Sequence, residues 1–148
     1  MTSSATKIPG FSLEDASRFV AASGFVIDEV GDTRLRGHVE LNEDHFTPWG
    51  VVHGGLYATI VESAGSVAAS YAVAERGQFA VGVHNATDFL RPSTGGLASV
   101  QAEALQQGRT QQLWQVVITD DAASKVLARG LLRLQNVALP GTPPDRTA

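Results

Sequence analysis

The chain contains 148 residues, of which 43% are hydrophobic and 18% are charged, a balance typical of a folded globular domain and not of a disordered chain. Its length favours one domain, because two would each have a thin core. Lys and Arg total 11 against 15 Asp and Glu, and the formal charge of −4 argues against a broad surface for nucleic acid or anionic lipid. The absence of cysteine excludes disulfides, thiolate catalysis and cysteine-bound zinc.

The two ends of the chain differ in composition from its middle. Residues 1–10 lack the apolar segment of a signal peptide, and no apolar run approaches the ~18 residues of a membrane-spanning helix. We therefore expect a cytoplasmic protein that is not bound to a membrane. We divide it into an N-terminal segment (1–24), one folded domain (25–138) and a Pro-rich, disordered tail (139–148).

The first third of the chain predicts a short helix and two strands. Ser12, followed by two acidic residues, predicts the start of a helix that extends to Ala22 and ends at Ser23-Gly24. Strands are predicted over 25–30 and 33–41, with a turn between them, and residues 42–52 predict a loop. The second strand alternates, so that one face carries Leu35, Gly37, Val39 and Leu41.

Residues 54–76 predict one long, buried helix. The segment has no proline, and its one charged residue before Glu75 is Glu62. A helix of this length measures roughly 33 Å, and little of it can face water. Its main apolar stripe recurs at helical spacing and comprises Leu56, Ile60, Ala64, Val67, Tyr71 and Ala74. Gly77 is suited to end the helix in a left-handed conformation.

Four further strands are predicted over 79–90, 97–107, 111–119 and 125–137. Short turns join them, which indicates an antiparallel sheet. Strands and helices do not alternate, so the fold class is α+β: a sheet of about six antiparallel strands wrapped around one long central helix. One sheet leaves a side of that helix open, which favours a partner chain.

Glu62 is the first candidate for chemistry, because a buried carboxylate costs several kcal/mol unless it is paired, hydrogen-bonded or neutralised. It either forms an ion pair with an arginine from a strand or acts as a base or nucleophile. Small and polar residues at i, i+3 and i+4 spacing surround it, as in the wall of a small pocket: Gly55, Thr59, Ser66 and Ser70.

The second candidate is the start of the helix at His53-Gly54-Gly55. Free N–H groups in a first helical turn can hold a carbonyl oxygen as it becomes an oxyanion. The alternatives are a tight loop-to-helix turn and a capping or packing role for His53. No metal site is predicted, because the histidines lie on different elements: His38, His45, His53 and His84. The G-x-S-x-G motif of serine hydrolases is absent.

The segment 47–55 (Thr-Pro-Trp-Gly-Val-Val-His-Gly-Gly), followed by Glu62, resembles hotdog-fold acyl-CoA thioesterases of the phenylacetate-degradation and 4-hydroxybenzoyl-CoA thioesterase type. The resemblance continues through 85–92 (Asn-Ala-Thr-Asp-Phe-Leu-Arg-Pro) and 107–110 (Gln-Gly-Arg-Thr) and covers roughly residues 25–137. It implies a hotdog fold and hydrolysis of an acyl-CoA, without a metal or prosthetic group, to a free acid and CoA.

The resemblance also implies roles for individual residues. Glu62 is the catalytic carboxylate, the Gly54 amide polarises the thioester carbonyl, His53 shapes that corner, and Ser66 helps to place water. Thr47 stands where family members usually carry Asn or Gln, a departure from the pattern. The residues matching substrate-binding positions are Arg91, Gly108, Arg109 and Thr110 near the CoA phosphates and pantetheine, and Gly82 and His84 beside the pantetheine arm.

The expected partners are an aryl-CoA or medium-chain acyl-CoA and a second copy of the chain. Gly54 and Glu62 are about 12 Å apart along one helix, so a homodimer with antiparallel helices would complete each site. The resemblance adds a tetramer of two dimers. Two other functions stay open: a hotdog hydratase or dehydratase, which needs an Asp/His pair, and a non-catalytic acyl-CoA-binding protein, which the Thr47 departure would suit.

Overall fold

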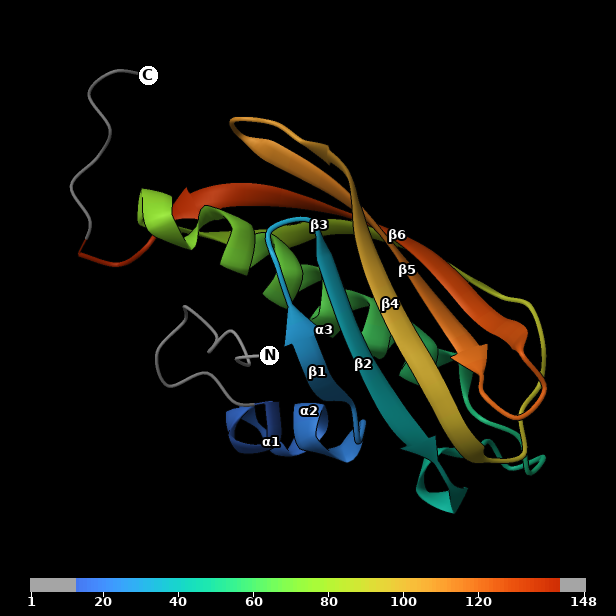
Figure 1. Cartoon of the computed structure of the whole chain (residues 1–148). Coiled ribbons are helices and arrows are strands. Elements are labelled where there is room, and N and C mark those ends of the chain that lie inside the picture. The colour runs from blue at the N-terminus through green and yellow to red at the C-terminus, as the bar shows by residue number, and fades with distance from the viewer. Residues whose placement is uncertain (1–12, 142–148) are drawn as a thin grey trace.

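The computed structural model describes residues 13–141 (Figure 1). Its helices are α1 (Leu13–Ala16), α2 (Arg18–Ala22) and α3 (Gly54–Val73), with single 3-10 turns at η1 (Glu43–His45) and η2 (Ala74–Arg76). Its strands are β1 (Val26–Val30), β2 (Arg34–Leu41), β3 (Gln78–Phe89), β4 (Gly96–Gln107), β5 (Gln111–Asp120) and β6 (Lys125–Ala138). Helix α3 runs along one face of the curved sheet.

The sheet has six strands in the order β1-β2-β4-β5-β6-β3, and every neighbouring pair is antiparallel. The predicted α+β architecture is therefore confirmed. Strand β3 does not pair with β4, which follows it in the chain. It lies beside β6, so β1 and β3 are the two edges of the sheet.

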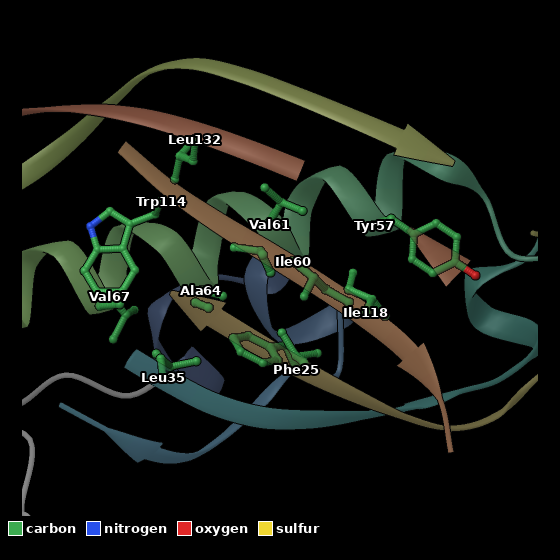
Figure 2. Packing of buried hydrophobic residues seen from close by; sticks show 14 of the residues in the cluster. Phe25, Leu35, Tyr57, Ile60, Val61, Ala64, Val67, Trp114, Ile118 and Leu132 are labelled. Atoms are coloured by element: carbon green, nitrogen blue, oxygen red, sulfur yellow. The ribbon is translucent and has the colours of Figure 1, made fainter. Parts of the chain in front are cut away.

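Helix α3 is buried along most of its length, as its lack of charge predicts. Its apolar side chains face β5 and β6, where Trp114, Ile118 and Leu132 are fully buried (Figure 2). The helix ends through η2 at Gly77, which adopts a left-handed φ of 68°. This conformation costs glycine little, so the predicted termination is confirmed.

The N-terminal helix differs from its prediction, and Ser12 lies outside the described residues. Two short helices replace one, because Ser17 between them has an extended backbone, with φ at −164°. Its hydroxyl accepts a hydrogen bond from the Val20 amide at 3.1 Å and caps α2. A serine side chain that bonds to the backbone in this way competes with a continuous helix.

A buried polar cluster connects α3 to the hairpin between β4 and β5. Gln112 donates to the Ala69 carbonyl at 3.1 Å and to Asn136 Oδ1 at 2.7 Å, and it accepts from the Trp114 indole. Asn136 in turn donates to the carbonyls of Gly108 and Arg109. These bonds satisfy the buried amides and hold the hairpin at the C-terminal end of α3.

The C-terminal segment continues past β6. Leu139, at the start of the predicted tail, donates its amide to the Gly77 carbonyl at 2.9 Å, while residues 142–148 lie outside the described range. Among the described residues, no helix is both long enough and apolar enough to cross a membrane.

Gly37 offers a test of how tightly β1 and β2 pack. A Cβ at Gly37 would overlap the Val26 carbonyl oxygen and come within 2.6 Å of the Phe25 ring. We expect Gly37→Ala to lower the free energy of unfolding by about 1–3 kcal/mol, as overpacking does in protein cores. Gly31→Ala is the control, since its Cβ would meet nothing nearer than 3.7 Å. Equal stabilities of the two variants in urea denaturation would contradict the packing.

Candidate functional site

His53 caps the N-terminus of α3. Its Nδ1 accepts a hydrogen bond from the Gly55 amide at 2.8 Å, so the proton of the neutral ring lies on Nε2, which is left to donate outward. Its own amide donates to the His45 carbonyl. His45 is buried and bonds to the Ala22 carbonyl through Nε2, so it anchors this loop.

The Gly54 amide is free at the start of the helix. Among the described residues, no hydrogen bond uses this N–H. The Phe89 ring packs against Gly54, and a Cβ there would come within 2.7 Å of it. An unpartnered amide at a helix N-terminus is a donor for an oxygen that gains negative charge.

Glu62 lies halfway along α3 and faces strand β3. The ion pairs of the described residues join Arg36 to Glu29 and His38 to Asp28, so the expected alternative of an arginine partner for Glu62 is wrong for this part of the chain. Its Oε2 instead accepts a hydrogen bond from Asn85 at 3.3 Å. A Cβ at Gly82 would overlap Oε1, so glycine at this position leaves room for the carboxylate.

Two cavities flank this side of α3. The larger, of about 740 Å³, is mainly apolar and has Glu62 on its wall; the other lining residues include Leu13, Val20, Ser66, Val67, Phe79 and Leu139. The smaller, of about 430 Å³, is lined by His53, Gly55, Leu56 and Thr59 among others. The predicted polar stripe therefore does line cavities, although Thr59 also bonds to the Gly55 carbonyl and Ser70 to Ala80.

The candidate residues for CoA do not gather in one place. Arg91 follows β3 and is exposed, and its amide donates to the Leu127 carbonyl at the start of β6. The exposed hairpin 108–110 is held by Asn136, which pairs with Ala80 near the start of β3. From Ala80 to Phe89 the strand extends over about 30 Å, so one chain presents these groups at opposite ends of its sheet.

Two other candidates lie apart from Glu62. His84 pairs with Arg133, and both side chains are exposed on strands whose other faces meet the helix. The Thr47 hydroxyl accepts from the Trp49 amide at 3.2 Å within a turn of the loop, and the Trp49 ring projects into solvent with 85% of its surface exposed. Residues 13–141 contain no cluster of His, Asp and Glu suited to a metal ion.

Residues 50–126 match the sequence model of the thioesterase superfamily. A protein of Mycobacterium tuberculosis named as an esterase is 40% identical over 121 residues, which cover 80% of this chain and 86% of that one. The chain belongs to the thioesterase superfamily. Its sheet wrapped around one long helix is the hotdog fold that the resemblance implies.

Solved structures and a plant relative are also similar to this chain. The solved structure of the Mycobacterium tuberculosis protein has a TM-score of 0.80 at 39% identity and covers 86% of this chain and all of that one. An Arabidopsis thaliana protein named 1,4-dihydroxy-2-naphthoyl-CoA thioesterase 2 is 32% identical, covering 74% of this chain and 68% of that one. A Haemophilus influenzae thioesterase structure has a TM-score of 0.78 at 27% identity, covering 90% and 96%.

Among the described residues of this thioesterase-superfamily chain, shifted pKa values occur at Glu29, Arg36 and Tyr57. On the solvent-facing side of β1 and β2, the hydrogen bond between Glu29 and Arg36 lowers the pKa of the carboxyl and raises that of the guanidinium. Burial raises the pKa of the Tyr57 hydroxyl, whose ring packs beside Phe89 at 6.3 Å between centroids. None of these groups contacts Glu62.

Two residues beside the site were not singled out from the sequence as site residues. Asn85 and Phe89 contact Glu62 and Gly54, respectively. Both lie in the segment 85–92 that carries the family resemblance, but neither side chain type by itself indicates catalysis. Their contacts depend on how β3 lies against α3.

His53 offers a test that separates capping from chemistry. We expect His53→Ala to lower the free energy of unfolding by about 1 kcal/mol, because the Gly55 amide loses its acceptor. His53→Asn supplies another good capping side chain and should recover most of that loss in urea denaturation. A variant His53→Ala as stable as the wild type would show that the cap contributes little.

Proposed function

We propose that the protein hydrolyses an acyl-CoA thioester to a free acid and CoA, with Glu62 as its catalytic carboxylate. One observation supports this above the others: Glu62 lies on the wall of an apolar cavity without a cationic partner among the described residues. A structural ion pair would have explained a helix carboxylate in this position. Membership of the thioesterase superfamily supports the reaction class.

The Gly54 amide and the Glu62 carboxylate have separate roles in the reaction. The Gly54 amide binds the thioester oxygen as negative charge develops on it during attack at the carbonyl carbon. Glu62 either takes the proton of the attacking water or attacks the carbonyl itself and is released by water. In both routes the C–S bond breaks, the CoA thiolate leaves and takes up a proton, and the acid is released.

The larger cavity suits an apolar acyl group. Leu13, Val20, Val67 and Phe79 offer hydrocarbon surface beside Glu62, and Ser66 offers a hydroxyl with which to place water. These features support an aryl or medium-chain acyl-CoA. The relative named for an aromatic CoA thioester favours the aryl class, which fits the phenylacetate-degradation and 4-hydroxybenzoyl-CoA branch as a proposal.

We infer that two chains form each site. Strand β3 is an edge strand of 12 residues, so it offers unpaired backbone groups to a second copy of the chain. It contains no proline or lysine to oppose such pairing, and Val81 and Val83 are exposed along it. An antiparallel pairing of two β3 strands about a two-fold axis would bring Gly54 of one chain toward Glu62 of the other. It would also bring Arg91 of one chain toward Arg109 of the other, where both could bind the phosphates of one CoA.

The first test measures hydrolysis of benzoyl-CoA and decanoyl-CoA with a thiol reagent. We expect Glu62→Gln to lower kcat by at least about 1000-fold while CoA still binds, because the lost carboxylate acts in the transition state. CoA binding by calorimetry is the control. Binding without hydrolysis by the wild type would favour a non-catalytic acyl-CoA-binding protein, and a Glu62→Gln variant with normal kcat would remove Glu62 from the mechanism.

The second test is complementation between chains. Gly54→Pro deletes the amide proton, so we expect this variant to be inactive. Gly54→Ala keeps the proton but, like proline, places a Cβ against the Phe89 ring, so it measures the cost of that contact alone. Refolding Gly54→Pro with Glu62→Gln should restore about a quarter of wild-type activity, since half of randomly formed dimers are mixed and each holds one intact site of two.

The control for complementation is a chain that carries both substitutions, which should restore nothing when refolded with Glu62→Gln. Mixed dimers that form but stay inactive would overturn the shared site. A monomer in analytical ultracentrifugation that still hydrolyses acyl-CoA would do the same.

A further inference from the structure

We propose that Asn85 is a positioning residue that holds the Glu62 carboxylate in its reactive orientation, and that Thr87 orients Asn85 for this task. The proposal rests on the proposed function, since it assumes that Glu62 is the catalytic carboxylate. It assigns individual roles to two residues of β3 that lie in the segment 85–92 but for which the family resemblance implied no role.

The hydrogen bonds form a directed chain from β3 to the helix. Thr87 donates its hydroxyl proton to Asn85 Oδ1 at 2.7 Å. Asn85 Nδ2 donates to the Ala58 carbonyl at 3.0 Å and to Glu62 Oε2 at 3.3 Å. Because a carbonyl can only accept, the NH₂ end of the amide must face the helix and its oxygen must face Thr87.

The Thr87 hydroxyl lies against the backbone of β6 on a half-buried side chain. It lies opposite Gly130, where a Cβ would come within 2.8 Å of Oγ1 and within 2.7 Å of Val61. A glycine at this position of β6 therefore leaves room for the threonine beside α3. The surrounding backbone and the hydrogen bond together restrict the rotamer of Thr87.

A β-bulge explains why these residues face the helix. The pairing of β3 with β6 shifts between Gly82 and His84, leaving Val83 as an extra residue. Before the bulge, Ala80 and Gly82 pair with residues of β6 that face the core; after it, Asn85 and Thr87 do so. Bulges re-aim side chains in this way. Without the extra residue, Asn85 would lie on the outer face.

The consequence for Glu62 is a carboxylate held through one of its two oxygens. Asn85 binds Oε2, and Gly82 leaves space for Oε1, which has no hydrogen-bond partner among the described residues. One oxygen is therefore oriented and the other is left to act on water or on the thioester. Fixing a reactive group in one geometry lowers the barrier without strengthening substrate binding.

The experiment compares Thr87→Val, which removes the hydroxyl at nearly constant shape, with Thr87→Ser, which keeps it. With benzoyl-CoA or decanoyl-CoA, whichever is hydrolysed faster, we expect Thr87→Val to lower kcat about tenfold with KM within about twofold. Thr87→Ser should stay within about twofold of the wild type. If the Thr87 hydroxyl served stability alone, Thr87→Val would lower the unfolding temperature and would not alter kcat selectively.

A second comparison tests whether Thr87 acts through Asn85. Asn85→Ala should lower kcat at least as much as Thr87→Val, and the double variant should lose no more than Asn85→Ala alone, because both substitutions break the same chain. Asn85→Asp should be the most impaired, since it loses the NH₂ donor and places a second carboxylate beside Glu62.

The proposal is overturned if Thr87→Val keeps wild-type kcat, if Thr87→Ser is as impaired as Thr87→Val, or if the losses of the two single variants multiply in the double variant. An inactive Glu62→Gln alongside any of these results would leave the proposed function standing and refute the positioning role alone. A Glu62→Gln variant with normal kcat would overturn both.

Discussion

Helix α3 has one charged side chain among 20 residues, and the free-energy cost of exposing its apolar faces shapes the rest of the molecule. The sheet curves so that β5 and β6 cover the helix with Trp114 and Leu132. Buried polar groups on the helix have hydrogen-bond partners: the Ser70 hydroxyl bonds to the backbone of β3, and the Ala69 carbonyl accepts a hydrogen bond from Gln112. Glu62 lies where this coverage ends, beside an apolar cavity.

The same constraint connects the fold to its expected assembly. A single sheet covers the helix from one side. Both cavities, the His53 cap and the Glu62 carboxylate lie where the sheet leaves the helix open, and residues of α1 and α2 also line the cavities there. The edge strand β3 borders this side and supplies Gly82, Asn85 and the Phe89 ring. One strand therefore provides the surroundings of Glu62 and, in the dimer that we propose, the contact between chains.

Local sequence patterns predicted the helices and strands well, but they predicted less well which strands lie side by side in the sheet. Three features follow from the spacing of residues close together in the chain: the helix that begins at Gly54, its end at Gly77, and the alternation of buried and exposed residues in β2. The break at Ser17 was not predicted, because capping and helical continuation compete at similar cost. The position of β3 beside β6 was not predicted either, since a short connection shows that strands can be antiparallel but not that they pair.

The sequence by itself determined a long buried helix with a lone carboxylate and a Gly-Gly start. Composition and periodicity are local properties, and a helix that is apolar on nearly all faces must be buried in any fold. Tertiary structure decided which side chains meet that carboxylate. A strict alternation would place Gly82 and His84 on one face of β3, whereas the bulge at Val83 sends His84 outward and brings Asn85 to Glu62. The face of a strand residue beyond a bulge depends on cross-strand pairing, and that pairing exists only once the sheet has formed.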